Sequence, residues 1–87
     1  MARYLAYHAG LLTMPTYYFD FEFNEKVYRD EEGIEFLDAA IAQKQMRLTL
    51  LDMAKQVFAN DGSRQLVGTI RDEGGVLWRG CLSFETD

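Results

Sequence analysis

The chain contains very little cysteine, histidine and proline, with one of each among its 87 residues. Its single cysteine, Cys81, cannot close an internal disulfide, which favours a reducing compartment such as the cytoplasm. Its single histidine, His8, has no cysteine or second histidine at the spacing of metal ligands. The glycine-rich loops that hold phosphates or dinucleotides are also absent. We therefore expect a protein that is not an enzyme and that uses no cofactor or metal.

Basic residues are fewer than acidic ones. Nine Lys and Arg stand against fourteen Asp and Glu, which gives a net charge of -5 and a pI near 4.7. Because this charge repels phosphate backbones and anionic lipid headgroups, nucleic acid and membrane surfaces are disfavoured as partners. Hydrophobic residues make up 48% of the chain and are evenly spread, which is typical of a soluble globular domain and not of a membrane span.

Residues 1–13 are expected to be an N-terminal extension to a single domain that spans residues 14–87. Met14 is a second possible start, and an aromatic strand follows it directly. The extension contains a short apolar run, but no clear small-residue cleavage site follows this run, which argues against a secretory signal. We expect the extension to be loosely ordered or to pack on the domain edge, and to be dispensable for folding.

An aromatic segment near Met14 predicts the first strand, from Thr16 to Phe23. Its aromatic residues occupy alternate positions, the period of a half-buried strand: Tyr17, Phe19, Phe21 and Phe23. Asn24 and Glu25 then predict a turn into a short second strand over residues 26–29.

The rest of the sequence predicts one long helix followed by a hairpin. Residues 35–59 contain no Gly or Pro, and Asn60, Asp61 and Gly62 form a good helix stop. Two strand-like segments follow, at residues 64–71 and 76–85, and two glycines lie in the link between them. The predicted fold class is α+β in the order ββαββ, with antiparallel β-hairpins packed against the helix.

Five carboxylates lie close together before the helix: Asp30, Glu31, Glu32, Glu35 and Asp38. Such a cluster suits a hard cation, but its spacing does not match a calcium-binding loop. We interpret these residues as charges just before and within the first helical turn, where they stabilise the positive end of the helix dipole. Whether the segment binds a cation stays open at this point.

Two apolar stripes run along the predicted helix. The first consists of Leu37, Ala40, Ile41, Leu48, Leu51 and Phe58, and the second of Met46, Leu50, Met53 and Val57. A helix that lies on one sheet needs only one such stripe, so the second stripe needs another cover. We expect the first stripe to pack on the sheet and the second to form a homodimer interface, for which methionine is well suited. Loops or the N-terminal extension are the alternative cover.

Three arginines could gather on the open face of the sheet and hold an anion: Arg64, Arg71 and Arg79. This arrangement would make the chain a small-ligand or anion sensor. The simpler interpretation is that Arg71 and Arg79 form surface ion pairs with neighbouring carboxylates, which contribute about 0 to 1 kcal/mol.

Several segments together resemble a family. The MPTYYFDF segment, RDEEGIEF and the following DAA at residues 38–40 resemble a small uncharacterised family of bacterial domains, abundant in rhizobia and related alpha-proteobacteria. Its members share an aromatic YYFD strand and a DxEGxE segment, and the similarity runs from Met14 through most of the chain. The resemblance implies a bacterial cytoplasmic protein and carries no activity with it.

Taken together, these features predict a small non-catalytic interaction or regulatory module. We expect it to be homodimeric through its long helix and to bind a protein partner that the sequence does not identify. The anion sensor is the alternative.

Overall fold

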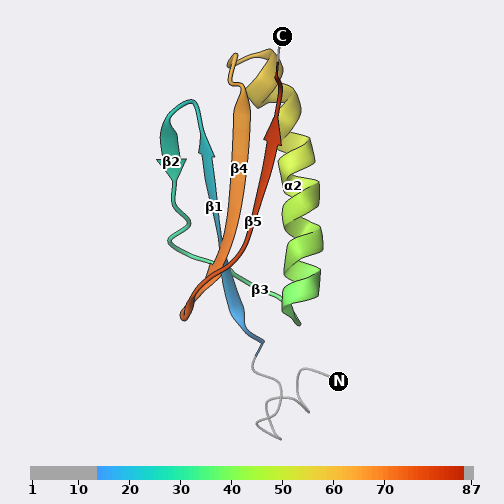
Figure 1. Cartoon of the computed structure of the whole chain (residues 1–87). Helices are drawn as coiled ribbons and strands as arrows, with labels where there is room; N and C mark the ends of the chain where they lie inside the picture. Colours follow the sequence, from blue (N-terminus) through green and yellow to red (C-terminus); the bar gives the residue numbers. More distant parts are fainter. Residues whose placement is uncertain (1–13, 86–87) are drawn as a thin grey trace, which may run out of the picture.

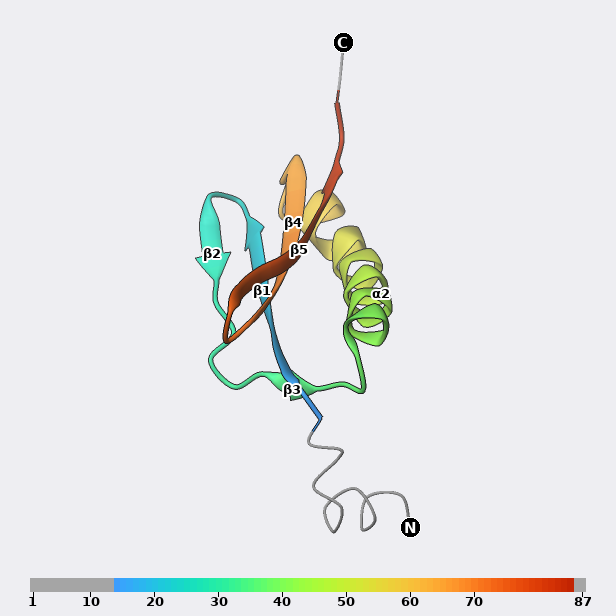
Figure 2. The same ribbon diagram turned by 60° about the horizontal axis from the view of Figure 1, so that its bottom comes forward.

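The computed structural model describes residues 14–85, which form five strands and one helix. In chain order the elements are β1 (Thr16–Phe23), β2 (Lys26–Tyr28), β3 (Ile34–Glu35), α2 (Ala39–Ala59), β4 (Gln65–Asp72) and β5 (Gly75–Ser83). The strands form an antiparallel sheet in the order β2-β1-β4-β5, and β3 pairs with the start of β1. Helix α2 runs along one side of this sheet (Figure 1 and Figure 2). The predicted extension at residues 1–13 lies outside the described residues.

Both predicted β-hairpins, β1–β2 and β4–β5, form where the sequence predicts them. Asn24 and Glu25 have positive φ angles of 56° and 63°, the conformation of a two-residue type I′ turn between β1 and β2. At the other hairpin, Asp72 pairs with Gly75, and its Oδ1 accepts a hydrogen bond from the Gly74 N–H at 2.7 Å. The α+β class is therefore confirmed.

The segment before the helix differs from the prediction. Ile34 and Glu35 are not helical but form the extra strand β3, which pairs with Tyr17 and Thr16. The helix begins only after Asp38, whose extended backbone and Oδ1 acceptor for the Ile41 N–H, at 2.9 Å, make it the N-cap. The predicted order ββαββ is thus incomplete by one short strand, because backbone pairing with β1 holds this segment extended.

The two apolar stripes of the helix have exchanged roles. Met46, Leu50 and Val57 of the second stripe are buried against the chain's own sheet, and Met53 is partly buried beside them. Four residues of the first stripe are exposed by 43 to 61%: Leu37, Ile41, Leu48 and Leu51. The prediction that Met46, Leu50, Met53 and Val57 form a homodimer interface is therefore wrong. Three of these side chains are buried in the core of the chain itself, and Met53 is partly buried beside them.

Gly68 in β4 explains this orientation of the helix. A Cβ atom at Gly68 would lie 2.7 Å from Met46 Sδ and 2.9 Å from Leu50 Cδ2. The missing side chain thus leaves a depression in the sheet that these two long side chains fill, and their burial holds the second stripe against β4. Tyr17 and Phe19 of β1 and Leu66 and Ile70 of β4 complete this buried cluster.

Candidate functional site

The polar interactions of the domain centre on Arg71 of β4. Its Nε lies 2.8 Å from Oδ2 of Asp20 on β1, and both side chains are largely buried, with 16% and 13% of their surface exposed. The Arg71 Nη2 also donates to the backbone carbonyl of Asp30 at 2.6 Å. Its guanidinium carbon lies 4.6 Å from the ring centre of Tyr18, within the range of a cation–π interaction. Hydrogen bonding to Asp20 raises the pKa of Arg71 above its usual value.

Asp30 ties the loop between β2 and β3 to strand β1. Its carboxylate accepts backbone hydrogen bonds from Phe19 at 3.1 Å and from Glu32 and Gly33 at 3.0 Å each, while its own N–H donates to Asp20 Oδ1 at 2.8 Å. Partial burial acts to raise the pKa of Asp30, but the hydrogen bonds from Gly33, Phe19 and Glu32 and the charge of Arg71 outweigh it. The pKa therefore lies below its usual value.

The acidic segment follows its predicted role only in part. Asp30 holds the loop and Asp38 caps the helix. Glu35 belongs to β3, and no acidic residue lies in the first turn of α2. Within residues 14–85, no three His, Cys, Asp or Glu side chains are arranged to hold a metal ion.

Of the three arginines proposed to hold an anion, Arg71 is already paired with Asp20 and Arg64 lies apart, while Arg79 is a diagonal neighbour of Arg71 on the same face of the sheet. Arg71 reaches across β1 to Asp20, while Arg79 lies on β5, opposite Thr69 of β4. Arg64 precedes β4, seven residues before Arg71, which corresponds to about 23 Å along an extended strand. The pairing of Asp20 with Arg71 was not predicted from the sequence. It depends on the register between β1 and β4, and no local sequence pattern encodes that register.

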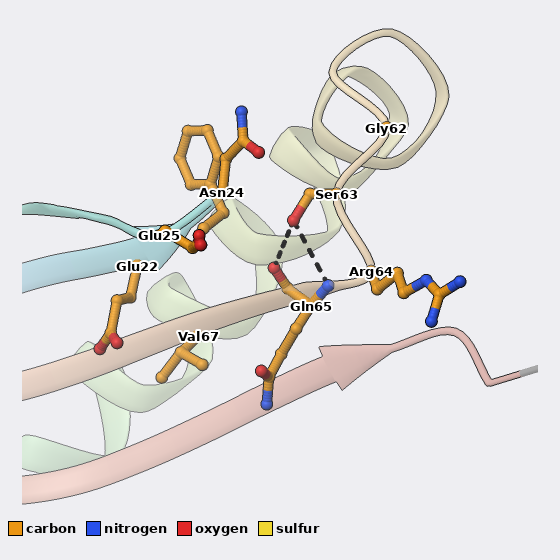
Figure 3. Close-up of a pocket in the computed structure, with 9 residues that line it drawn as sticks. Glu22, Asn24, Glu25, Gly62, Ser63, Arg64, Gln65 and Val67 are labelled. Atoms are coloured by element: carbon orange, nitrogen blue, oxygen red, sulfur yellow. Dashed lines mark hydrogen bonds between the residues drawn. The ribbon is translucent and has the colours of Figure 1, made fainter.

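A shallow hollow of about 430 Å³ lies where β1 and β4 meet the end of the helix (Figure 3). The Ser63 hydroxyl on its wall donates to the Gln65 carbonyl at 2.9 Å and accepts from the Gln65 N–H at 3.4 Å. Figure 3 shows the Arg64 side chain pointing away from Glu22 and Glu25. These polar groups do not converge on one point, so the hollow lacks the arrangement of a small-molecule site.

One group of exposed apolar side chains follows the helix. We define the helix outer stripe as Leu37, Ile41, Leu48 and Leu51, which are exposed in the part of the chain that the structure describes. A groove of about 250 Å³ adjoins this stripe between α2 and β5, and its lining is almost entirely apolar: Arg47, Leu50, Leu51, Trp78, Gly80, Cys81 and Leu82. Exposed apolar side chains gathered on one side of a helix are a feature of interaction sites.

The fold and this surface define a class of protein, a small α+β domain with a candidate interaction face. A family profile described as "Domain of unknown function (DUF6894)" matches residues 16–83, and the chain belongs to this family. No curated protein and no solved structure gives a match. Among the described residues, no helix is both long and apolar enough to cross a membrane.

Proposed function

We propose that this protein is a small non-catalytic interaction or regulatory module that forms a homodimer through the helix outer stripe. The exposure of Leu48 and Leu51, at 48% and 61%, carries the proposal together with that of Leu37 and Ile41. The resemblance to alpha-proteobacterial domains supports a bacterial cytoplasmic setting. The dimer face is thus on the opposite side of the helix from the one that the sequence suggested.

The physical reason is the amount of apolar surface that a two-fold contact would bury. Fully burying one leucine or isoleucine side chain contributes about 1.5 to 3 kcal/mol, and a two-fold contact uses each residue of the stripe twice. Charges of both signs lie on the same exposed side of the helix, namely Lys44, Asp52 and Lys55. The aliphatic stems of the two lysines can cover apolar surface while their charged ends stay in water.

The test is the solution mass of the full chain at micromolar concentration. We expect the wild type to sediment as a dimer and Leu48→Glu as a folded monomer, because a charge at the centre of an apolar contact opposes association. Gln56→Glu adds the same charge to the polar side of the helix and should stay dimeric. A monomeric wild type, or a Leu48→Glu variant that stays dimeric, would contradict the proposal.

The anion sensor has less support in this geometry. Arg71 is already paired with Asp20, and Arg64 lies far from it along β4. Association that persists at high salt favours the apolar interface, whereas dependence on added phosphate would favour the sensor.

A further inference from the structure

We propose that the outer edge of β5 binds an extended segment of a partner protein by strand addition, and that this segment alternates apolar with acidic residues. The inference rests on the proposed role as an interaction module and names the chemistry of a second partner. The edge of β5 adjoins the helix outer stripe and shares Leu51 with it, but Cys81→Pro and Leu48→Glu each change only one of the two surfaces, so the two can be tested separately.

The first argument is the open backbone of β5. This strand of nine residues lies at the end of the sheet order, and within residues 14–85 no strand pairs with its outer side. The Phe84 N–H donates to the Arg64 carbonyl at 3.0 Å, so by the antiparallel alternation the even-numbered residues of β5 bond to β4. The N–H and C=O groups of Arg79, Cys81 and Ser83 therefore point outward. A row of such groups is a template for an added strand.

The composition of β5 leaves this edge unprotected. Native sheets blunt a free edge with short strands, prolines, bulges or charges. The opposite edge follows this rule, because β2 has three residues. In contrast, β5 contains no Pro, Asp, Glu or Lys, and its one charged residue is Arg79. The register irregularity between Ile70 and Arg71 of β4 lies opposite residues 76–78, near the start of β5. Its regular part, residues 78–83, is free to pair.

The second argument is the groove that runs beside this edge. Figure 1 and Figure 2 show α2 running next to β5, and Leu51, Trp78 and Leu82 line the space between them. Alternate side chains of an added strand would point toward the helix side of the sheet. At these positions the partner segment needs apolar residues, because the groove offers them apolar walls.

Charge decides between the possible occupants. In a chain with a net charge of -5, cationic residues are found on both sides of this edge. Arg47 lines the groove, and Arg79 is exposed on β5, on the opposite face from Trp78 by strand alternation. Carboxylates at the intervening positions of a partner would point to the face that carries Arg79 and would meet it there. A second copy of β5 has no acidic residue to offer to Arg79, and residues 1–13 contain Arg3 but no acidic residue.

The test measures binding of synthetic peptides to the full chain by fluorescence anisotropy. The probe is a labelled seven-residue peptide in which valine and aspartate alternate. Its controls are the same peptide with lysine for aspartate, and a peptide of the same composition with the valines and aspartates in separate blocks. We expect the alternating acidic peptide to bind roughly tenfold or more tightly than either control.

Cys81→Pro is the decisive variant. Because the Cys81 N–H points away from β4, proline there should leave the ladder between β4 and β5 intact and block only the outer edge. We expect it to abolish peptide binding and to leave the solution mass unchanged. Arg79→Glu, an exposed change that is compatible with folding, should weaken binding roughly tenfold.

Three results would overturn the inference. The first is that the alternating acidic peptide does not bind, and the second is that its binding survives both Cys81→Pro and Arg79→Glu. The third is that Cys81→Pro converts the wild-type dimer into a monomer, which would show that a second copy of the chain occupies this edge. Leu48→Glu separates the two proposals. If this variant is monomeric and still binds the peptide, both proposals stand, and if the wild type is monomeric yet binds the peptide, only the homodimer fails.

Discussion

Arg71 Nε and Asp20 Oδ2 lie 2.8 Å apart and join residues 51 positions apart in the sequence. The pair is diagonal, because the direct strand partner of Arg71 is Tyr18, whose ring lies below the guanidinium. A single side chain thus connects β1, β4 and the loop that carries Asp30. Asp20 makes this ion pair although it lies outside the acidic cluster at residues 30–38.

The first prediction is energetic coupling between these two residues. Asp20→Asn and Arg71→Gln should each destabilise the protein, and the double variant should lose less than the sum of the two. We expect a favourable coupling energy between them, because the two side chains are hydrogen-bonded and largely shielded from solvent. Urea unfolding of the four proteins measures it. Additive losses would show that the pair is only a weak surface contact.

The second prediction concerns acid stability and Asp30. Its pKa is lowered in the folded state from an ordinary value of 3.8, so its contribution to stability is complete above that value and is lost as the pH falls through the folded pKa. Asp30→Asn should therefore be less stable than the wild type at neutral pH, by about 1 to 2 kcal/mol. The difference should shrink on acidification below pH 3.8. Urea titrations across this range measure it, and a constant difference would argue against the assignment.

The third prediction compares two glycines with positive φ angles. Gly33 and Gly62 have φ angles of +78° and +69°, a conformation that costs an alanine about 1 to 2 kcal/mol. A Cβ at Gly33 would also lie 2.6 Å from Thr16 Cγ2, whereas one at Gly62 meets nothing within 4 Å. Gly33→Ala should therefore cost about 2 to 4 kcal/mol and Gly62→Ala about 1 to 2. Equal losses in thermal unfolding would show that the loop at Gly33 can move aside.

Local sequence signals predicted four of the five strands, the hairpin turns and the end of the helix, because each depends on neighbouring residues. Alternating aromatics define β1, and Asn60 to Gly62 end α2. The start of the helix was less predictable, since Ile34 and Glu35 are held extended by pairing with distant β1. The side of the helix that faces the sheet was also not encoded locally. Both stripes are apolar, and the choice between them depends on the space above Gly68.

The same contrast between local sequence signals and long-range packing applies to the residues of the candidate site. Arg64, Arg71 and Arg79 were identified as cations, but the register of β4 and the position of Asp20 determine where they lie. The exposed leucines were identified as apolar, and only the packed structure shows which of them face solvent. A sequence pattern thus gave the chemical character of these residues, while their availability for binding required the tertiary structure.

The last prediction tests the orientation of the helix with two adjacent residues. Leu50 is 3% exposed in the core, and Leu51 is 61% exposed on the helix outer stripe. Leu50→Asp removes buried apolar contacts that are worth about 2 to 5 kcal/mol and adds a buried charge. This loss is comparable to the whole stability of a small domain, so the chain should unfold.

Leu51→Asp is the matched control, with the same chemical change one position along the helix. Below the concentration at which the wild type dimerises, its stability should stay within about 0.5 kcal/mol of the wild type, as is usual for an exposed position. Far-ultraviolet circular dichroism and urea unfolding distinguish the two variants. At higher concentration Leu51→Asp should also weaken the dimer, because its charge lies on the helix outer stripe. A folded Leu50→Asp together with an unfolded Leu51→Asp would mean that the first stripe packs on the sheet, and both the packing and the proposed dimer face would be wrong.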